Sequence, residues 1–355
     1  MIVPHLPASR RGMTGSTHKK SRARSLFSSV CLAATLGLAL ALAAGFAGAL
    51  HPAFDSFAHL RVHVAGLLVV AGLIVFALGA PRIGAGAAIV AGLAVASTLS
   101  NPFWHSPAAA EAGSGWPDAP RYRLLQLNLR FDHPEPNRVL SLIARTHPDI
   151  VTLNEVSPHW RVAIERIAVA YPHRLVCAAR AGVGGVAILS RRPFAETAEK
   201  SCALGGRFAH AGIDLGGTTI TVAAVHFGWP WPSKQVVEAA RLAPAIAALD
   251  GPTILAGDFN ATPWSAFFTR FVTDGGFEAP PRVGVTWLHH ALPPSLRPAL
   301  GLPIDHVMTR GGIRLIQTRT GEDAGSDHVP VLADFVLDTP AGAEPIVAIA
   351  HAASR

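Results

Sequence analysis

The sequence predicts a mixed α/β domain that follows a group of membrane-spanning helices. Three observations support this fold class. The first hundred residues contain long apolar runs with very few charges. Residues 101–120 are rich in Pro, Ala and Gly, which is typical of a linker. From residue 121 onward, short apolar segments alternate with amphipathic ones, and this alternation is the pattern of strands and helices in one α/β domain.

Three apolar runs in the N-terminal part are expected to cross a membrane. The first, residues 26–50, is long enough to span a bilayer and too long for a cleaved signal peptide. The runs at 64–80 and 83–99 have 17 residues each, which is at the short end for a span. The third run is rich in Gly and Ala, and small residues allow helices to pack closely in lipid. We therefore predict three transmembrane helices.

The distribution of charge sets the expected orientation. The formal net charge is +7, but residues 1–25 hold six basic residues and no acid, and residues 105–355 carry no net charge. Under the positive-inside rule the basic arm stays in the cytoplasm, and the chain after the third span lies outside it. We expect a multi-pass protein of the cell (inner) membrane with an extracytoplasmic α/β domain. Because that domain is neutral, it lacks the electrostatic footprint of a nucleic-acid-binding protein.

The expected domains and elements follow from these patterns. The domains are a basic cytoplasmic arm (1–25), a membrane anchor (26–100), a linker (101–120), an α/β domain (121–337) and a flexible tail (338–355). Strands are expected at 122–129, 149–156, 184–191, 218–227, 252–260, 304–310 and 329–335. Helices are expected at 137–146, 158–171 and 233–250, the last with Ser233 as its N-cap.

The three cysteines allow two interpretations. Cys31 lies in the first apolar run and is interpreted as a packing residue. Cys177 and Cys202 lie in the α/β domain, where they are either two buried thiols or, if the domain is outside the cytoplasm, one disulfide. The sequence leaves both alternatives open.

Polar residues stand at an end of almost every predicted strand, where α/β sheets bind their ligands. Each has a purely structural explanation when taken alone, because Asn and Asp favour turns and a lone His is commonly a surface or core residue. Their recurrence at strand ends favours a functional site. The set is Asn128, Glu155, His226, Asp258, Asn260, Asp305, Asp327 and His328.

Part of this set suits a hard divalent cation and a phosphate. Oxygens of Asn128, Glu155 and Asp327 are ligands that Mg²⁺ or Mn²⁺ prefers. The imidazoles of His226 and His328 can donate hydrogen bonds to phosphoryl oxygens as charge develops on them.

The remaining acids suit acid–base chemistry. Asp258 is a candidate to take a proton from an attacking water that Asn260 orients, and Asp305 is a candidate to fix the orientation of a catalytic histidine. The chain has no Cys/His zinc spacing, no GxSxG and no phosphate-binding GxxxxGK[ST] motif. We expect metal-assisted hydrolysis of a phosphoester.

Seven segments resemble, in order, the motifs of the endonuclease/exonuclease/phosphatase superfamily, which has the deoxyribonuclease-I-like fold. They are QLNLR, PDIVTLNEV, GGVAILSR, VHF, ILAGDFN, LPIDHV and GSDHVPVLADF. GDFN, IDH and SDHVPV are specific for this superfamily when they occur together, whereas GDFN alone would not be. The resemblance covers residues 121–337 and implies a four-layer α/β sandwich, with two central sheets between helices, and a divalent metal.

The resemblance also implies roles. It assigns Asn128 and Glu155 to the metal side, His226 to a phosphate contact, Asp258 and Asn260 to the GDxN pair, Asp305 to the acid that orients the histidine, and Asp327 and His328 to the terminal pair. Members of the family differ over whether the residue corresponding to Asp258 or to His328 activates water, so this choice stays open. Asn154 stands where many members carry Gln, and we expect little consequence.

The resemblance implies a phosphorylated substrate without naming it, because family members hydrolyse DNA, RNA, sphingomyelin, inositol phosphates and other phosphoesters. An envelope lipid phosphate or pyrophosphate is favoured, because the domain is expected to be membrane-tethered and WPWP (229–232) resembles membrane-interface sequences. The arrangement of three spans followed by an external catalytic domain resembles membrane-bound bacterial members of the family. These include members linked to glycopeptide resistance, whose substrate would be a polyprenyl carrier. WPWP is alternatively a rigid loop over the sheet edge.

The sequence leaves two other functions to consider. An extracytoplasmic endonuclease or exonuclease acting on DNA or RNA is the alternative, and the neutral domain disfavours it. A non-enzymatic protein with a degenerate fold is disfavoured because the polar set has no gap. The sequence indicates no obligate protein partner.

Overall fold

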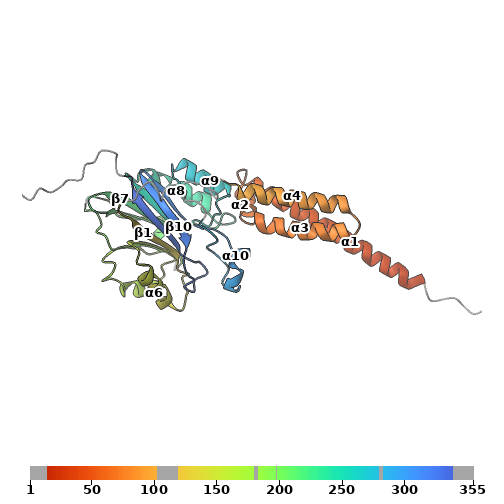
Figure 1. Cartoon of the computed structure of the whole chain (residues 1–355), viewed down its shortest axis with the longest axis horizontal. Coiled ribbons are helices and arrows are strands. Elements are labelled where there is room, and N and C mark those ends of the chain that lie inside the picture. The colour runs from red at the N-terminus through yellow and green to blue at the C-terminus, as the bar shows by residue number, and fades with distance from the viewer. Residues whose placement is uncertain (1–13, 102–118, 180–182, 197, 280–282, 339–355) are drawn as a thin grey trace, which may run out of the picture. The chain divides into compact units, whose positions relative to one another are not determined.

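The chain divides into two units, Met1–Ser100 and Asn101–Arg355, in this computed structural model (Figure 1). The structure describes residues 14–101, 119–179, 183–196, 198–279 and 283–338. Most of the predicted linker (101–120) and of the predicted tail (338–355) lies outside the described residues, as do residues 1–13 of the predicted arm. The two units are described separately.

Helices make up the described part of the first unit. They are α1 (Thr14–Phe46), α2 (Pro52–His59), α3 (Arg61–Ala77) and α4 (Pro81–Leu99). By length and composition, Arg22–Phe46 of α1 and the whole of α4 could cross a membrane. The predicted second span coincides with α3, which qualifies only together with α2, and these two helices are bent by 69° at the break between them. Two spans are thus supported and the third is not established.

Small residues let these helices pack closely, as the Gly/Ala content predicted. Leu42 of α1, Leu68 of α3 and Ala91 of α4 belong to one buried cluster. A Cβ atom added to Gly84 of α4 would lie 2.5 Å from the carbonyl oxygen of Gly72 on α3. Since α1 begins at residue 14, part of the predicted basic arm is helical and continuous with the predicted anchor.

Two sheets organise the second unit. The first contains, in spatial order, β10 (Ile313–Thr320), β11 (Val331–Leu337), β1 (Tyr122–Asn128), β2 (Ile150–Asn154), β4 (Val186–Ser190) and β3 (His173–Cys177). The second contains β5 (Ser201–Ala203), β6 (Phe208–Asp214), β7 (Thr219–His226), β8 (Thr253–Asp258) and β9 (Asp305–Arg310). Each sheet has one parallel pair, β1–β2 and β7–β8, among antiparallel neighbours.

Alternation along the strands places the core. Successive side chains of a strand point to opposite faces. Leu124 of β1 therefore packs between the sheets with Val222 of β7, whereas Leu125 faces the helices outside the first sheet. The helices on that side are α6 (Pro136–Thr146) and α7 (Pro158–Glu165); α8 (Gln235–Ala247) and α9 (Ala266–Asp274) cover the second sheet (Figure 1). The unit is a mixed α/β sandwich with two sheets, as predicted.

Every predicted strand is present, but four further strands were not predicted, because their sequences lack a continuous apolar run. β3, β5 and β10 lie at sheet edges, and β10 keeps Arg314, Gln317 and Arg319 exposed. β6 is built mainly of small residues. Helix α9 was also missed. The helix predicted at 158–171 ends at Glu165, and Ser233 does not cap α8, because Lys234 precedes its first turn without a side-chain cap bond.

Cys177 and Cys202 form a disulfide, so the alternative of two free thiols is wrong. Cys177 ends β3, an edge strand of the first sheet, and Cys202 lies in β5, an edge strand of the second. The bond therefore ties the two sheets together at one side. For a loop closed by residues 25 positions apart, the chain-entropy model gives about 3.5 kcal/mol of stabilisation.

Reduction of this disulfide is expected to lower the melting temperature of the second unit by roughly 7–14 °C, since the unfolded chain regains the entropy of the open loop. All seven tryptophans lie in residues 101–355, so tryptophan fluorescence of the full chain in detergent reports on this unit. Cys177→Ala/Cys202→Ala should melt like the reduced protein, and Cys31→Ala like the oxidised one. Equal melting with and without reductant would contradict the stabilising role.

Candidate active site

The ends of the two parallel strand pairs meet at one end of the sandwich. Asn128 of β1 pairs in register with Asn154 of β2, and Glu155 follows. In the second sheet, Asp258 of β8 is in register with His226 of β7 and with Asp305 of β9. Because β11 runs antiparallel to β1, the residues just before β11 reach the same end. The fold thus gathers side chains from both sheets.

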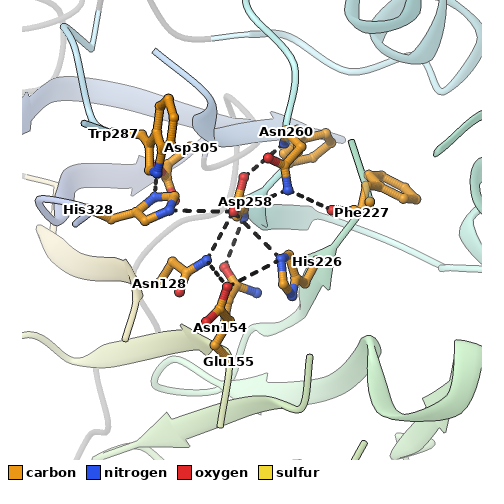
Figure 2. A network of polar contacts seen from close by, with 12 residues as sticks. Asn128, Asn154, Glu155, His226, Phe227, Asp258, Asn260, Trp287, Asp305 and His328 are labelled. Atoms are coloured by element: carbon orange, nitrogen blue, oxygen red, sulfur yellow. Dashed lines mark hydrogen bonds and ion pairs between the residues drawn. The ribbon is translucent and has the colours of Figure 1, made fainter. Parts of the chain in front are cut away.

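The carboxylate of Asp258 is the centre of this cluster (Figure 2). It is buried, and nitrogen atoms from four side chains surround its Oδ2 atom. They are Asn128 Nδ2 at 3.0 Å, Asn260 Nδ2 at 3.5 Å, His226 Nε2 at 3.6 Å and His328 Nε2 at 3.8 Å. Asp258 Oδ2 therefore lies close to both predicted imidazoles, of His226 and His328, and to both predicted amides, of Asn128 and Asn260.

His328 is held by a carboxylate on its other nitrogen. Its Nδ1 atom lies 2.7 Å from Asp305 Oδ2, so that Nε2 faces Asp258. Burial alone would lower the pKa of His328, but the charges of Asp305, Asp258 and Asp327 outweigh it and raise the pKa to about 10. Burial would raise the pKa of Asp305, yet the interaction with His328 keeps it below its usual value. The two groups form a buried ion pair.

The other titratable groups have shifted pKa values for different reasons. Burial, and then the nearby Asp305 carboxylate, raise the pKa of Asp258 to about 7. Burial, and then the charges of Arg207 and His328, lower the pKa of His226 to about 3, so that this imidazole is neutral. The site therefore places a carboxyl group that titrates near neutrality between one cationic and one neutral imidazole, which suits acid–base chemistry.

Asn260 closes the turn after β8. Its backbone has a φ of 47°, in the left-handed region that Asn tolerates. Its amide nitrogen Nδ2 donates to the carbonyl oxygen of Phe227 at 2.8 Å, and its backbone N–H donates to Asp258 Oδ1 at 2.8 Å. Gln235 of α8 donates to the carbonyl oxygens of Phe259 and Asn260 from outside. The loop that carries Asn260 is therefore fixed from both sides.

Of the predicted metal-side residues, two offer partly exposed carboxylates. Glu155 Oε2 accepts the backbone N–H of Phe131 at 2.9 Å, and Asp327 Oδ2 accepts the indole N–H of Trp287 at 3.2 Å. Asn128 presents its amide nitrogen to Glu155 Oε1 at 3.2 Å, because its carbonyl oxygen accepts from Arg130 N. To ligate through oxygen as predicted, the Asn128 amide would have to turn.

The donor atoms fit a divalent cation. Asp258, Asp305 and His328 offer ligand atoms that all lie within 4.8 Å of one another. These residues are buried, however, and Asp305 and His328 are already hydrogen-bonded to each other. Glu155 and Asp327 have free oxygen lone pairs and contact with solvent, which suits an ion such as Mg²⁺ that keeps several waters. We therefore favour the partly exposed pair, and the predicted ligand roles stay predictions.

Several side chains that hold the site were not predicted. Asn154, which stands where many family members carry Gln, accepts through Oδ1 from the Asp258 N–H at 2.9 Å and from Gln126 Nε2 at 2.7 Å. The Asn154 amide donates to the Val225 carbonyl at 2.8 Å. The sequence contains a signal for them, because Gln126, Asn128, Thr152 and Asn154 occupy alternate positions of two strands and share one buried face.

Comparison with known families now identifies the chain. Residues 125–328 match the model of the Endonuclease/Exonuclease/phosphatase family. The protein belongs to this family, whose members hydrolyse phosphoester bonds, include nucleases and phosphatases, and use divalent metals.

Solved structures agree on the fold. A family member from Bacteroides vulgatus is 17% identical, with 61% of this chain and 99% of that one covered and a TM-score of 0.51. Sphingomyelinase C from Streptomyces griseocarneus is 19% identical (61% and 99% covered, TM-score 0.46), and an AP endonuclease from Archaeoglobus fulgidus is 17% identical (61% and 100% covered, TM-score 0.48). No curated protein matches the chain. At 17% identity, the likeness to the Bacteroides vulgatus structure shows the fold alone.

Metal binding is expected to raise the melting temperature of the second unit, because a ligand that binds only the folded state stabilises it, by about 2.7 kcal/mol at 100 times its Kd. Glu155→Gln should lose most of the shift caused by Mg²⁺ or Mn²⁺, since a neutral amide replaces a charged ligand. Glu322→Gln, at an exposed acid, is the control. An undiminished shift in Glu155→Gln would exclude Glu155 as a ligand.

Proposed function

We propose that the protein is a membrane-anchored, divalent-metal-dependent phosphohydrolase that acts outside the cytoplasm on a lipid phosphate or pyrophosphate. The observation that carries the phosphohydrolase part is the convergence of His226, His328, Asn128 and Asn260 on Asp258 Oδ2. Positioned hydrogen-bond donors around one reacting group are what phosphoryl transfer requires.

The roles follow from protonation and geometry. Asp258 takes a proton from the attacking water, because its pKa of about 7 makes it a usable base near neutrality. Asn260 orients that water. His328 is cationic, with a pKa of about 10, and donates to a phosphoryl oxygen. His226 is neutral and contacts a second phosphoryl oxygen, while Asp305 keeps the His328 ring in place.

The metal site is part of the proposal. Glu155 and Asp327, with Asn128 after rotation of its amide, would hold Mg²⁺ or Mn²⁺. A bound divalent cation supplies positive charge to a phosphoryl oxygen and to the leaving oxygen. The new P–O bond forms from water as the bond to the leaving group breaks.

Two features support an extracytoplasmic membrane location. The first unit has helices apolar enough to cross a membrane, and six of its eight Lys and Arg residues lie before the first of them or in its first turn. The second unit contains the Cys177–Cys202 disulfide, and disulfides persist in oxidising compartments.

The surroundings of the site support a lipid substrate. Trp231 of the WPWP segment is 53% exposed. The ring of Trp229 lies 6.4 Å from that of Trp287, whose indole N–H reaches Asp327. Downstream of Trp287, Leu292, Leu296 and Leu300 are also exposed. Trp229 and Trp287 thus connect the WPWP segment with the predicted metal side, as expected for an enzyme that works at a bilayer surface.

A comparison of substrates tests the proposal. The full chain in detergent–lipid micelles with Mg²⁺ or Mn²⁺ is expected to release phosphate from a prenyl pyrophosphate in preference to a phospholipid or short DNA. His328→Ala should lower the rate by about 100-fold or more. Trp231→Ala should raise KM for the micellar substrate and leave a short-chain soluble pyrophosphate unaffected. Cleavage of DNA alone would overturn the substrate and keep the catalytic assignment.

The pH dependence provides a separate test of the roles. kcat/KM is expected to rise with pH through about 7, as Asp258 loses its proton, and to fall near pH 10, as His328 loses its own. Asp305→Asn removes a negative charge that raises the pKa values of Asp258 and His328. Both the rise and the fall of kcat/KM, the two limbs of the profile, should therefore move to lower pH. Glu322→Gln should leave the profile unchanged. Limbs that stay in place in Asp305→Asn would refute these assignments.

A further inference from the structure

A buried polar pair of the first sheet reaches across the interface between the sheets. Gln126 of β1 and Thr152 of β2 are neighbours in register, and both are fully buried on the face that meets the second sheet. The preceding pair on the same face, Leu124 and Ile150, lies two residues earlier in each strand. It is apolar and belongs to the core between the sheets. A core with only a packing role would continue this apolar pattern, because buried polar groups cost free energy unless each is hydrogen-bonded.

The hydrogen bonds fix which way the Gln126 amide points. The hydroxyl of Thr152 donates to Gln126 Oε1 at 3.0 Å, so that the amide nitrogen faces the second sheet. Nε2 donates to Asp305 Oδ1 of the second sheet at 3.2 Å and to Asn154 Oδ1 of the first sheet at 2.7 Å. Each polar atom of the Gln126 side chain therefore has a partner, and the orientation of the amide depends on the Thr152 hydroxyl.

The two oxygens of Asp305 are then held by different partners. Oδ1 accepts from Gln126, and Oδ2 lies 2.7 Å from His328 Nδ1. A carboxylate held at both oxygens cannot turn, so it keeps the proton of His328 on Nδ1 and leaves Nε2 facing Asp258 Oδ2 at 3.8 Å.

We infer that Gln126, oriented by Thr152, is a positioning residue that fixes the rotation of Asp305 and through it the ring of His328. The inference rests on the proposed function for its effect on rate. The hydrogen-bond relay itself can be observed without any substrate.

Two valine substitutions separate positioning from stability. Thr152→Val removes the hydroxyl that orients Gln126. Thr253→Val is the matched control, because Thr253 of β8 is also fully buried and its hydroxyl donates to the Gly251 carbonyl at 3.0 Å, outside this relay. Each variant loses one hydrogen bond and should melt at a similarly reduced temperature. Thr152→Ser keeps the hydroxyl and should behave like the natural protein.

The first readout is the low-field proton NMR resonance of the His328 Nδ1–H, assigned by its absence in His328→Ala. We expect Thr152→Val to shift or broaden this resonance, and Thr253→Val to leave it in place. The second readout is the rate: kcat should fall by about five- to tenfold in Thr152→Val, with KM nearly unchanged, and stay unchanged in Thr253→Val. If Thr152→Val does not fold, Thr152→Cys, with a weak donor in a similar space, replaces it.

An unchanged resonance in Thr152→Val, equal effects of the two valine variants, or the lack of any resonance that depends on His328 would overturn the inference. If the natural protein turns over none of the substrates, the proposed function fails, and the resonance still decides whether Gln126 and Thr152 position His328.

Discussion

The buried carboxylate of Asp258 is the constraint on which the rest of the site depends. A carboxylate inside a protein is costly unless hydrogen-bond donors surround it. Here the donors come from different parts of the fold, because Asn128 ends a strand of the first sheet, His226 ends a strand of the second, and His328 precedes β11. The two sheets must therefore meet at their strand ends, and any slip in register would remove a partner from Asp258.

The same convergence gives two similar imidazoles different charges. His328 has an ionised partner in Asp305 and is cationic, whereas His226 has no such partner within hydrogen-bond distance among the described residues and stays neutral because it is buried beside positive charge. Polar residues of β1 and β2 also hold the groups around these imidazoles. Asn154 accepts from the Asp258 backbone N–H, and Gln126 donates to the Asp305 carboxylate. Chemistry at the surface of the sandwich thus depends on hydrogen bonds made inside it.

The fold was largely predictable where burial produces a simple pattern. The central strands β2, β4, β7 and β8 have short apolar runs, because both of their faces are covered. Edge strands such as β3 and β10 have one partner and an exposed side, so their mixed sequences gave no signal. The apolar runs of the first unit were evident, but the bend between α2 and α3 was not, because hydropathy reports composition and not the direction of a helix.

The sequence by itself determined the family and the polar residues of the site, because motifs such as GDFN and SDHVPV place chemically distinctive side chains next to apolar strands. Only the tertiary structure decided which atoms meet. It joined Cys177 to Cys202, directed the Asn128 amide nitrogen rather than its oxygen toward the acids, and gave Gln126, Thr152 and Asn154 their place beneath the site. These contacts join residues far apart in the chain or depend on side-chain rotation, and neither property leaves a local pattern in the sequence.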